Sequence, residues 1–124
     1  GLLTDKYLHG VPEGSRATDT KGGANMIARF MNDDVLGRVQ KLKPIADDLG
    51  ISMAQLAVAW VLGNDNVAGA IIGASRPEQV VENVGASGVV LDAGVRAAID
   101  EALGDVVQAD PGMTARNAPA SRPV

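Results

Sequence analysis

The sequence contains no cysteine and almost no aromatic residues, with one Phe, one Tyr and one Trp. The lack of cysteine excludes disulfides, thiolate metal sites and cysteine nucleophiles, and it is compatible with a reducing cytoplasm. Because 46 % of the residues are nevertheless hydrophobic, the core must be built from Ala, Val, Ile and Leu. Such a core suits helices packed over parallel strands.

Long apolar runs and an excess of basic residues are also missing. No run approaches the ~20 residues that a membrane-spanning helix needs, and the first residues do not form a signal sequence. We therefore expect no membrane association and a cytoplasmic location. The net charge of -4 argues against nucleic acid as a partner, because phosphate backbones are bound by basic stripes.

Residues 1–32 have few periodic apolar positions and several glycines, so we predict a long loop. Loops of more than ~12 to 15 residues in a compact domain are usually functional or disordered, and this one invites a binding role. Most of the basic residues lie within residues 1–43. At the other end, residues 105–124 contain prolines and no periodicity, and we predict a disordered tail there.

Periodic apolar positions predict a helix between Asn32 and Gly50, with a kink or break near Gln40 to Lys43 because Pro44 lies inside it.

Two further helices are indicated by their caps. Ser52 and Gln55 have the spacing of a capping box, which predicts a helix that runs to about Leu62. Asp92 predicts the start of a last helix, over residues 93–103.

The most informative stretch lies between these helices. The apolar run Val67 to Ile72 predicts one buried strand, and Ser75 and Glu78 predict a capping box for a helix from about Arg76 to Gly85. A tight turn between strand and helix exposes the first helical N–H groups, which favour anions, and Arg76 adds a charge suited to phosphate. On spacing alone, an ordinary strand-to-helix turn without a ligand is the alternative.

Three blocks of the sequence resemble the aldo-keto reductase family, in the branch that includes potassium-channel β-subunits and their bacterial relatives. The first is Gly1-Leu2-Leu3-Thr4-Asp5-Lys6-Tyr7, followed by Gly10-Val11-Pro12 and Ser15-Arg16. The second runs from Ile45 to Trp60 and is similar to a helix pair of that branch. The third has the pattern G-A-S-x-x-x-Q-x-x-E-N, formed by Gly73, Ala74, Ser75, Gln79, Glu82 and Asn83.

The resemblance implies an α/β fold, the (β/α)8 TIM barrel. A complete barrel typically needs ~250 residues, so we expect this chain to be the C-terminal part of one, mostly helical with one clear strand. Residues 1–104 would belong to the barrel. A lone strand leaves both sheet edges unpaired, which also suggests self-association through those edges.

The resemblance further implies carbonyl reduction by hydride transfer from a nicotinamide dinucleotide, chiefly NADPH. The family's catalytic tyrosine, lysine, aspartate and histidine match no position here, so we expect no catalytic residue and a carbonyl substrate only in the complete barrel. What carries over is cofactor binding. Together with Arg76, the expected cofactor residues are Lys6, Arg16, Gly73, Ala74, Ser75, Gln79, Glu82 and Asn83.

Other candidates have simpler explanations. Tyr7 and His9 match no catalytic position, and the adjacent acids at 33–34 and 47–48 suit helix caps better than a metal site, so we predict no metal. The rival hypothesis is a noncatalytic truncated product or helical interaction module that binds no cofactor.

Overall fold

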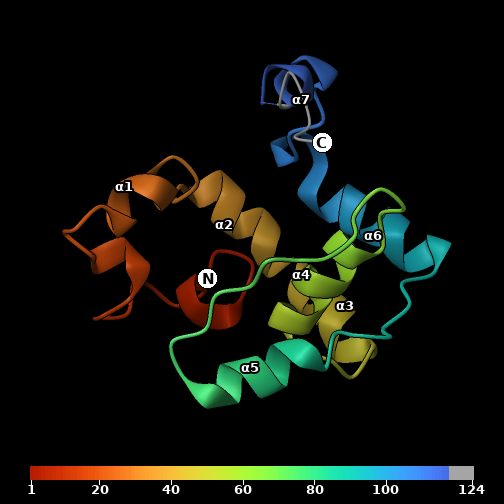
Figure 1. The fold of residues 1–124 in the computed structure, drawn as a ribbon, viewed down its shortest axis with the longest axis horizontal. Helices are drawn as coiled ribbons and strands as arrows, with labels where there is room; N and C mark the ends of the chain where they lie inside the picture. Colours follow the sequence, from red (N-terminus) through yellow and green to blue (C-terminus); the bar gives the residue numbers. More distant parts are fainter. Residues whose placement is uncertain (118–124) are drawn as a thin grey trace, which may run out of the picture.

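Helices supply the regular structure of residues 1–117, the part of the chain that the computed structural model describes (Figure 1). In chain order they are the 3-10 helices η1 (Asp5–Tyr7) and η2 (Arg16–Thr18), then α1 (Gly23–Ala28), α2 (Asp33–Gln40), α3 (Leu42–Asp48), α4 (Met53–Leu62), α5 (Pro77–Val84), α6 (Ala93–Leu103), η3 (Gly104–Val106) and α7 (Pro111–Asn117).

The helices with strong local signals form where we predicted them. A break at Lys41 separates α2 from α3, close to Pro44. Ser52 caps α4 reciprocally: its hydroxyl accepts from the Gln55 N–H at 3.2 Å, and its own N–H donates to Gln55 Oε1 at 3.0 Å. Asp92 Oδ1 accepts from the N–H of Val95 at 2.8 Å and starts α6. These caps satisfy helix N–H groups that have no partner inside the helix.

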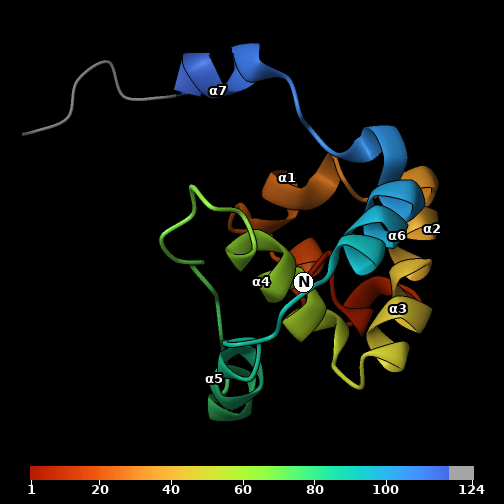
Figure 2. The same ribbon diagram turned by 90° about the vertical axis from the view of Figure 1, so that its right-hand side faces the viewer.

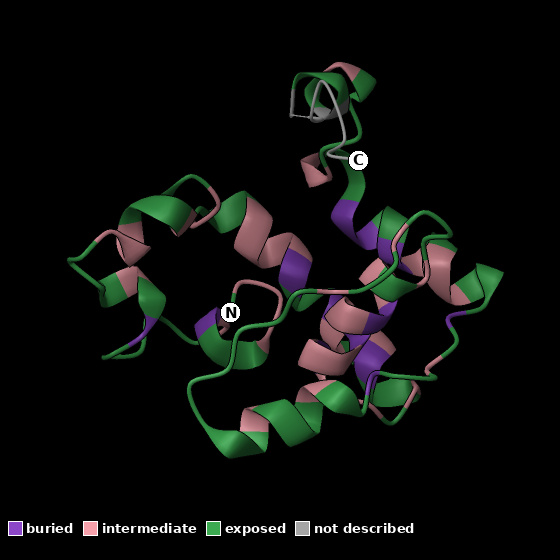
Figure 3. Cartoon of the chain, viewed as in Figure 1, coloured by how far each residue is buried: buried purple, intermediate pink, exposed green. Residues whose placement is uncertain are grey.

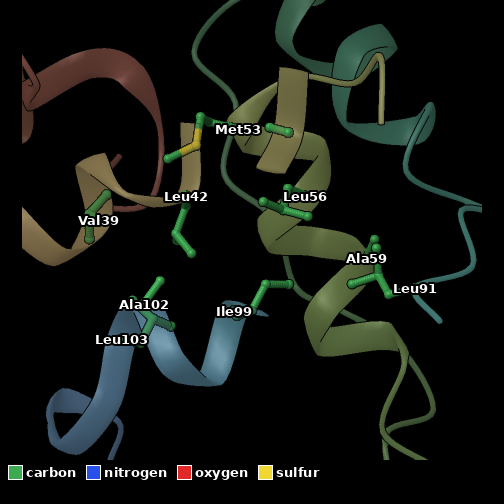
Figure 4. Close-up of a cluster of buried hydrophobic side chains, with 10 residues drawn as sticks. Val39, Leu42, Met53, Leu56, Ala59, Leu91, Ile99, Ala102 and Leu103 are labelled. Carbon is green, nitrogen blue, oxygen red and sulfur yellow. The ribbon is translucent and has the colours of Figure 1, made fainter. Parts of the chain in front are cut away.

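The core lies where α2, α3, α4 and α6 meet (Figure 4). Met53 and Leu56 are buried there, and Trp60 packs half-buried against the same cluster. Apart from Met53, the members of the cluster are Ala, Val, Ile or Leu, as the composition predicts: Val39, Leu42, Ala46, Met53, Leu56, Ala59, Leu91, Ile99, Ala102 and Leu103.

Two arginines connect α6 to its neighbours. Arg38 on α2 donates from Nη1 to the carbonyl oxygen of Leu103 at 3.0 Å and lies 2.9 Å from Asp105. Arg96 on α6 donates to the carbonyl oxygen of Gly63, which follows α4, at 2.8 Å. These bonds to helix-terminal carbonyls fix the spacing of α6 from α2 and α4.

The predicted strand over Val67 to Ile72 was wrong. Residues 67–76 form an irregular segment, and no strand occurs within residues 1–117. A strand requires a neighbour for its backbone groups, and no such neighbour lies beside this segment in the described chain. Ile71 accordingly has 104 % of its reference area exposed.

The predicted capping box of Ser75 and Glu78 was also wrong. The helix begins at Pro77, and Arg76 is the N-cap residue, with extended backbone angles of -141° and 148°. The residue before a proline is driven away from helical angles, whereas proline itself suits the first helical position. The N-cap therefore shifts one residue past Ser75.

The two ends contain more helix than we predicted. Residues 1–32, predicted as a loop, contain η1, η2 and α1. In the predicted tail, α7 follows Asp110, whose Oδ1 accepts from the N–H of Gly112 at 2.8 Å. Figure 2 shows α7 projecting away from the other helices. The rest of the predicted tail, residues 118–124, lies outside the described residues.

Within the described residues, a single helix long and apolar enough to cross a membrane is not found. The pair Asp33–Asp48 and Met53–Leu62 reaches the required length and composition together, but it is bent by 92°.

Candidate functional site

A cavity of about 710 Å³ lies between the N-terminal segment, α4, the irregular segment and α5. Its floor is apolar and comes from α4, whereas its polar groups come from η1 and α5. The residues that line it are Gly1, Leu2, Leu3, Thr4, Lys6, Ala54, Ala57, Val58, Val61, Gly69, Ala70, Ile71, Ile72, Gly73, Gln79, Glu82 and Asn83. Segments far apart in the sequence thus share one cavity.

The cavity brings together several residues of the predicted cofactor site. Lys6 lines it from η1, and Gly73 lines it from the irregular segment. Gln79, Glu82 and Asn83 line it from α5. Since the spacing i, i+3 and i+4 puts three residues on one helix face, the polar face of α5 is the one turned to the cavity.

The position of α5 depends on one bond to α4. Gln55 Nε2 donates to the carbonyl oxygen of Glu82 at 2.9 Å, and α5 packs against α4. Most of α5 and the segment before it are exposed (Figure 3). The exposed residues include an apolar face formed by Val80, Val81 and Val84.

Gln79 closes the turn before α5. Its Oε1 accepts from the N–H of Ser75 at 2.7 Å, from the N–H of Arg76 at 3.2 Å and from the Ser75 hydroxyl at 3.2 Å. The backbone N–H groups that we expected to bind an anion are therefore engaged by a side chain of the same turn. Gln79 has only its NH₂ group left for a ligand.

Ala74, Ser75 and Arg76 are exposed and do not line the cavity. The side chain of Arg76 is 70 % exposed, and its Nε lies 4.0 Å from Glu78 Oε2. Such a separation in solvent gives little attraction, so the guanidinium keeps its capacity to bind an anion beside the turn.

Lys6 and Arg16 belong to different short helices, but both positive charges affect the amine of Gly1. Lys6 follows Thr4, whose Oγ1 accepts from the Lys6 N–H at 3.2 Å and caps η1. Arg16 is exposed on η2 and does not line the cavity. Burial lowers the pKa of the Gly1 amine, and the positive charges of Lys6 and Arg16 lower that pKa further. Both cations are thus close to the N-terminal edge of the cavity.

Ser15 is a buried polar residue next to Arg16, and it does not line the cavity. It is only 5 % exposed, and its Oγ has no hydrogen-bond partner among the described residues. Buried hydroxyls normally have partners. The signal available in the sequence was its place beside Arg16 in the S-R pair.

The residues that we did not expect to be catalytic or metal-binding are buried in the fold, exposed to solvent, or paired with a basic residue. Tyr7 is buried against the N-terminal segment, and His9 is exposed. Asp34 pairs with Arg38 and Asp47 pairs with Lys43. In residues 1–117, groups of acidic or histidine side chains that could hold a metal ion are not found.

Comparison with known proteins decides the family. The model of the aldo/keto reductase family matches residues 1–103. This chain belongs to the aldo/keto reductase family. Membership implies the barrel fold that we predicted, although the strand expected in this portion is not formed.

The similar proteins include channel subunits and reductases. A probable voltage-gated potassium channel subunit beta of Arabidopsis thaliana is 46 % identical over 91 residues, which are 73 % of this chain and 27 % of the relative. A putative subunit beta of Schizosaccharomyces pombe is 44 % identical, over 68 % of this chain and 25 % of the relative. The L-glyceraldehyde 3-phosphate reductase of Escherichia coli K12 is 40 % identical, again over 68 % and 25 %. The chain thus spans about a quarter of these aldo/keto reductase relatives.

Proposed function

We propose that this chain is the C-terminal, cofactor-binding portion of an NADPH-dependent aldo-keto reductase, which reduces a carbonyl to an alcohol by hydride transfer. One observation carries the proposal. The cavity joins Lys6 from one end of the chain to Gly73, Gln79, Glu82 and Asn83 from another. These are residues at which the sequence matches the family's cofactor pattern.

The α5 side of the cavity suits an adenine ring. The Gln79 NH₂ group, the Glu82 carboxylate and the Asn83 amide offer both donors and acceptors to its edge. The apolar floor from α4, formed by Ala54, Ala57, Val58 and Val61, suits the faces of the ring. A volume of about 710 Å³ lies within the range of small-molecule sites, ~300 to 1,000 Å³.

The cations around the cavity suit phosphate groups. Lys6 lies on the wall, Arg16 is near the N-terminal edge, and Arg76 is exposed beside the turn before α5. A planar guanidinium can hold a phosphate with two parallel hydrogen bonds. We assign Arg76, with Ser75, to the 2′-phosphate that distinguishes NADPH from NADH, and Lys6 and Arg16 to the pyrophosphate.

The proposal limits what the chain does alone. Positions matching the family's catalytic residues do not occur in the sequence, so the carbonyl substrate would be bound and reduced only in a complete barrel. The similarity to a named L-glyceraldehyde 3-phosphate reductase supports reductase chemistry for that complete protein.

The test is calorimetric titration of the 124-residue chain with NADPH and NADH, together with the variants Lys6→Ala and Arg76→Ala. We expect saturable binding that favours NADPH. Each variant should weaken NADPH binding about tenfold, because a hydrogen bond to a charged group contributes about 1.5 to 3 kcal/mol. Arg76→Ala should remove most of the preference for NADPH over NADH.

Lys41→Ala is the matched control, since Lys41 is exposed and does not line the cavity. Absence of binding by a chain that unfolds cooperatively would reject the proposal and favour a noncatalytic interaction module. Equal losses in Lys6→Ala and Lys41→Ala would show only a general electrostatic attraction.

A further inference from the structure

Residues 64–90 connect α4 to α6 and form an arm of the fold (Figure 1). The arm contains the irregular segment and α5, so it supplies Gly73, Gln79, Glu82 and Asn83 to the proposed cofactor cavity. The apolar floor on the other side of that cavity comes from α4. The shape of the cavity therefore depends on how the arm is held against the helices.

The first part of the arm has little support of its own. Hydrogen bonds to the backbone groups of residues 68–74 are not found within residues 1–117. Farther along, α5 packs against α4 and is joined to it by the bond of Gln55 to the Glu82 carbonyl oxygen. Segments with few protected hydrogen bonds open readily, so the way in which the two ends of the arm are fixed also matters for its position.

Arg96 of α6 holds both ends of the arm. Its Nη2 donates to the Gly63 carbonyl oxygen at 2.8 Å, and its Nε donates to the Leu91 carbonyl oxygen at 3.1 Å. Gly63 directly precedes the arm and Leu91 directly follows it, so one guanidinium joins the two ends. The Gly63 carbonyl group lies at the C-terminus of α4, where helix carbonyls lack partners within the helix and a positive charge is favourable.

The surroundings of Arg96 suit this role. A Cβ at Gly63 would crowd Arg96 Nη2, so the guanidinium reaches the backbone at a point where no side chain intervenes. Arg96 is half-buried, and it forms no ion pair within the described part of the chain. A guanidinium presents its N–H donors in a fixed plane, and here that plane joins the two carbonyl oxygens.

We propose that Arg96 is a positioning residue for the cofactor cavity, a role that rests on the proposed function of that cavity. By joining the ends of the arm, it keeps the α5 wall at a fixed distance from the α4 floor. Arg96 does not line the cavity and does not touch the nucleotide. Its loss should therefore weaken NADPH and NADH alike, because a site that is competent for only part of the time binds each ligand more weakly by the same factor.

The test is calorimetric titration of the Arg96→Met variant of the 124-residue chain with NADPH and with NADH. Methionine keeps an unbranched apolar stem but removes both donors. We expect both dissociation constants to rise about tenfold, which is the effect of losing hydrogen bonds made by a charged group, and the preference for NADPH to stay. Hydrogen exchange in residues 64–90 should speed up, because the arm opens more often.

Arg38→Met is the matched control. Arg38 also joins two helices through a helix-terminal carbonyl oxygen, that of Leu103, but it lies outside the arm and does not line the cavity. This variant should lose stability in urea denaturation while both dissociation constants stay unchanged. The contrast separates a role in the cavity from a general contribution to the fold.

The proposal is overturned if Arg96→Met binds both nucleotides as tightly as the unsubstituted chain, and the proposed function then still stands. It is also overturned if Arg38→Met loses as much affinity, or if Arg96→Met loses only the preference for NADPH, which would indicate a direct phosphate contact. Absence of binding by the folded unsubstituted chain rejects the proposed function together with this role. Should Arg96→Met fail to fold, Arg96→Lys compared with Arg38→Lys makes the same test, because an ammonium lacks the planar fork of the guanidinium.

Discussion

The Gln79 side chain caps the turn before α5, and we propose that it also binds the nucleotide. Its Oε1 caps the turn by accepting from Ser75 and Arg76, and its NH₂ group is left to bind the adenine that we place in the cavity. A phosphate that binds the same backbone N–H groups must displace this oxygen. Cap and ligand therefore compete for the same donors.

We predict that Gln79→Glu separates these roles. A carboxylate accepts more strongly from the two N–H groups and interacts favourably with the positive end of α5, for a gain of about 0.3 to 1 kcal/mol in the free energy of unfolding. It also loses the NH₂ donor and repels phosphate, so NADPH affinity should fall about tenfold or more. Urea denaturation and calorimetry measure the two effects.

Gln79→Ala is the companion variant, because it removes the cap without adding charge. It should lower the free energy of unfolding by about 1 kcal/mol. An increase in NADPH affinity in Gln79→Glu would contradict the assignment of this turn to the nucleotide.

The hydroxyls of Ser15 and Ser52 differ in their hydrogen bonding and should therefore differ in their contribution to stability. Ser15 Oγ is buried without a partner in the described chain, whereas Ser52 Oγ accepts from the N–H of Gln55. We predict that Ser15→Ala leaves the free energy of unfolding unchanged or raises it, because no hydrogen bond is lost. Ser52→Ala should lower it by about 1 kcal/mol.

Urea denaturation of both serine variants, measured side by side, checks this prediction. A loss of more than about 1 kcal/mol in Ser15→Ala would show that its hydroxyl has a partner, and the contrast with Ser52 would fail.

Among the elements, α5 is attached to the rest of the fold through α4. Gln55 holds it by a side-chain bond to the Glu82 carbonyl oxygen, and the same Gln55 completes the cap of α4. A Cβ at Gly85 would crowd Gln55 Nε2, so a larger residue there would shift the Gln55 amide from this bond. The polar wall of the proposed cofactor cavity therefore depends in part on Gln55.

We predict that Gln55→Glu loosens α5 while α4 stays intact. The new carboxylate still accepts from the Ser52 N–H, since Glu and Gln both complete capping boxes, but it cannot donate to the Glu82 carbonyl oxygen. Hydrogen exchange should speed up in α5 and stay unchanged in α4, and the free energy of unfolding should fall by about 0.5 to 1.5 kcal/mol. Faster exchange in α4 alone would contradict this division of roles.

The features that could be predicted from the sequence are those set by interactions between residues close together in the chain. The caps of α4 and α6 are hydrogen bonds between residues three apart, Ser52 with Gln55 and Asp92 with Val95. The starts of these helices could therefore be predicted. At α5 the proline outweighed the S-x-x-E spacing, a local effect that the sequence contained and that we gave too little weight.

The segment from Val67 to Ile72 failed for a different reason. Its composition is typical of a buried strand. A strand forms only when its backbone is hydrogen-bonded to a second strand, and the described residues provide no such partner for it. The same limit applies to the site: spacing alone put Gln79, Glu82 and Asn83 on one helix face, whereas only the family resemblance placed Lys6 with them. The Ser15 hydroxyl was found only through its burial.

The surface of the molecule includes a group of exposed aliphatic side chains on α5 and the segment before it. Val80, Val81 and Val84 are exposed on α5, and Ile71 projects from the segment before it. An amphipathic helix normally buries its apolar face, and larger exposed patches mark contact sites. We propose that two copies of the chain associate through this surface when nothing else covers it, in place of the sheet edges that the sequence suggested.

Sedimentation velocity checks this proposal over a range of concentrations. We predict concentration-dependent association of the 124-residue chain, and a shift to monomer in Val81→Glu, because a buried unpaired carboxylate opposes the contact. Val11→Glu is the control, since Val11 is exposed in the N-terminal loop. A monomer at every concentration, or equal effects of the two variants, would contradict association through α5.

We propose that the cavity between the N-terminal segment, α4 and α5 binds a nucleotide. The most direct measurement is titration of the ¹⁵N-labelled 124-residue chain with NADPH while the backbone amide resonances are followed. We predict saturable shifts that cluster in residues 1–6, 54–61 and 69–83, and smaller shifts with NADH near Arg76. Shifts confined to other parts of the chain, or no shifts from a folded protein, would contradict it.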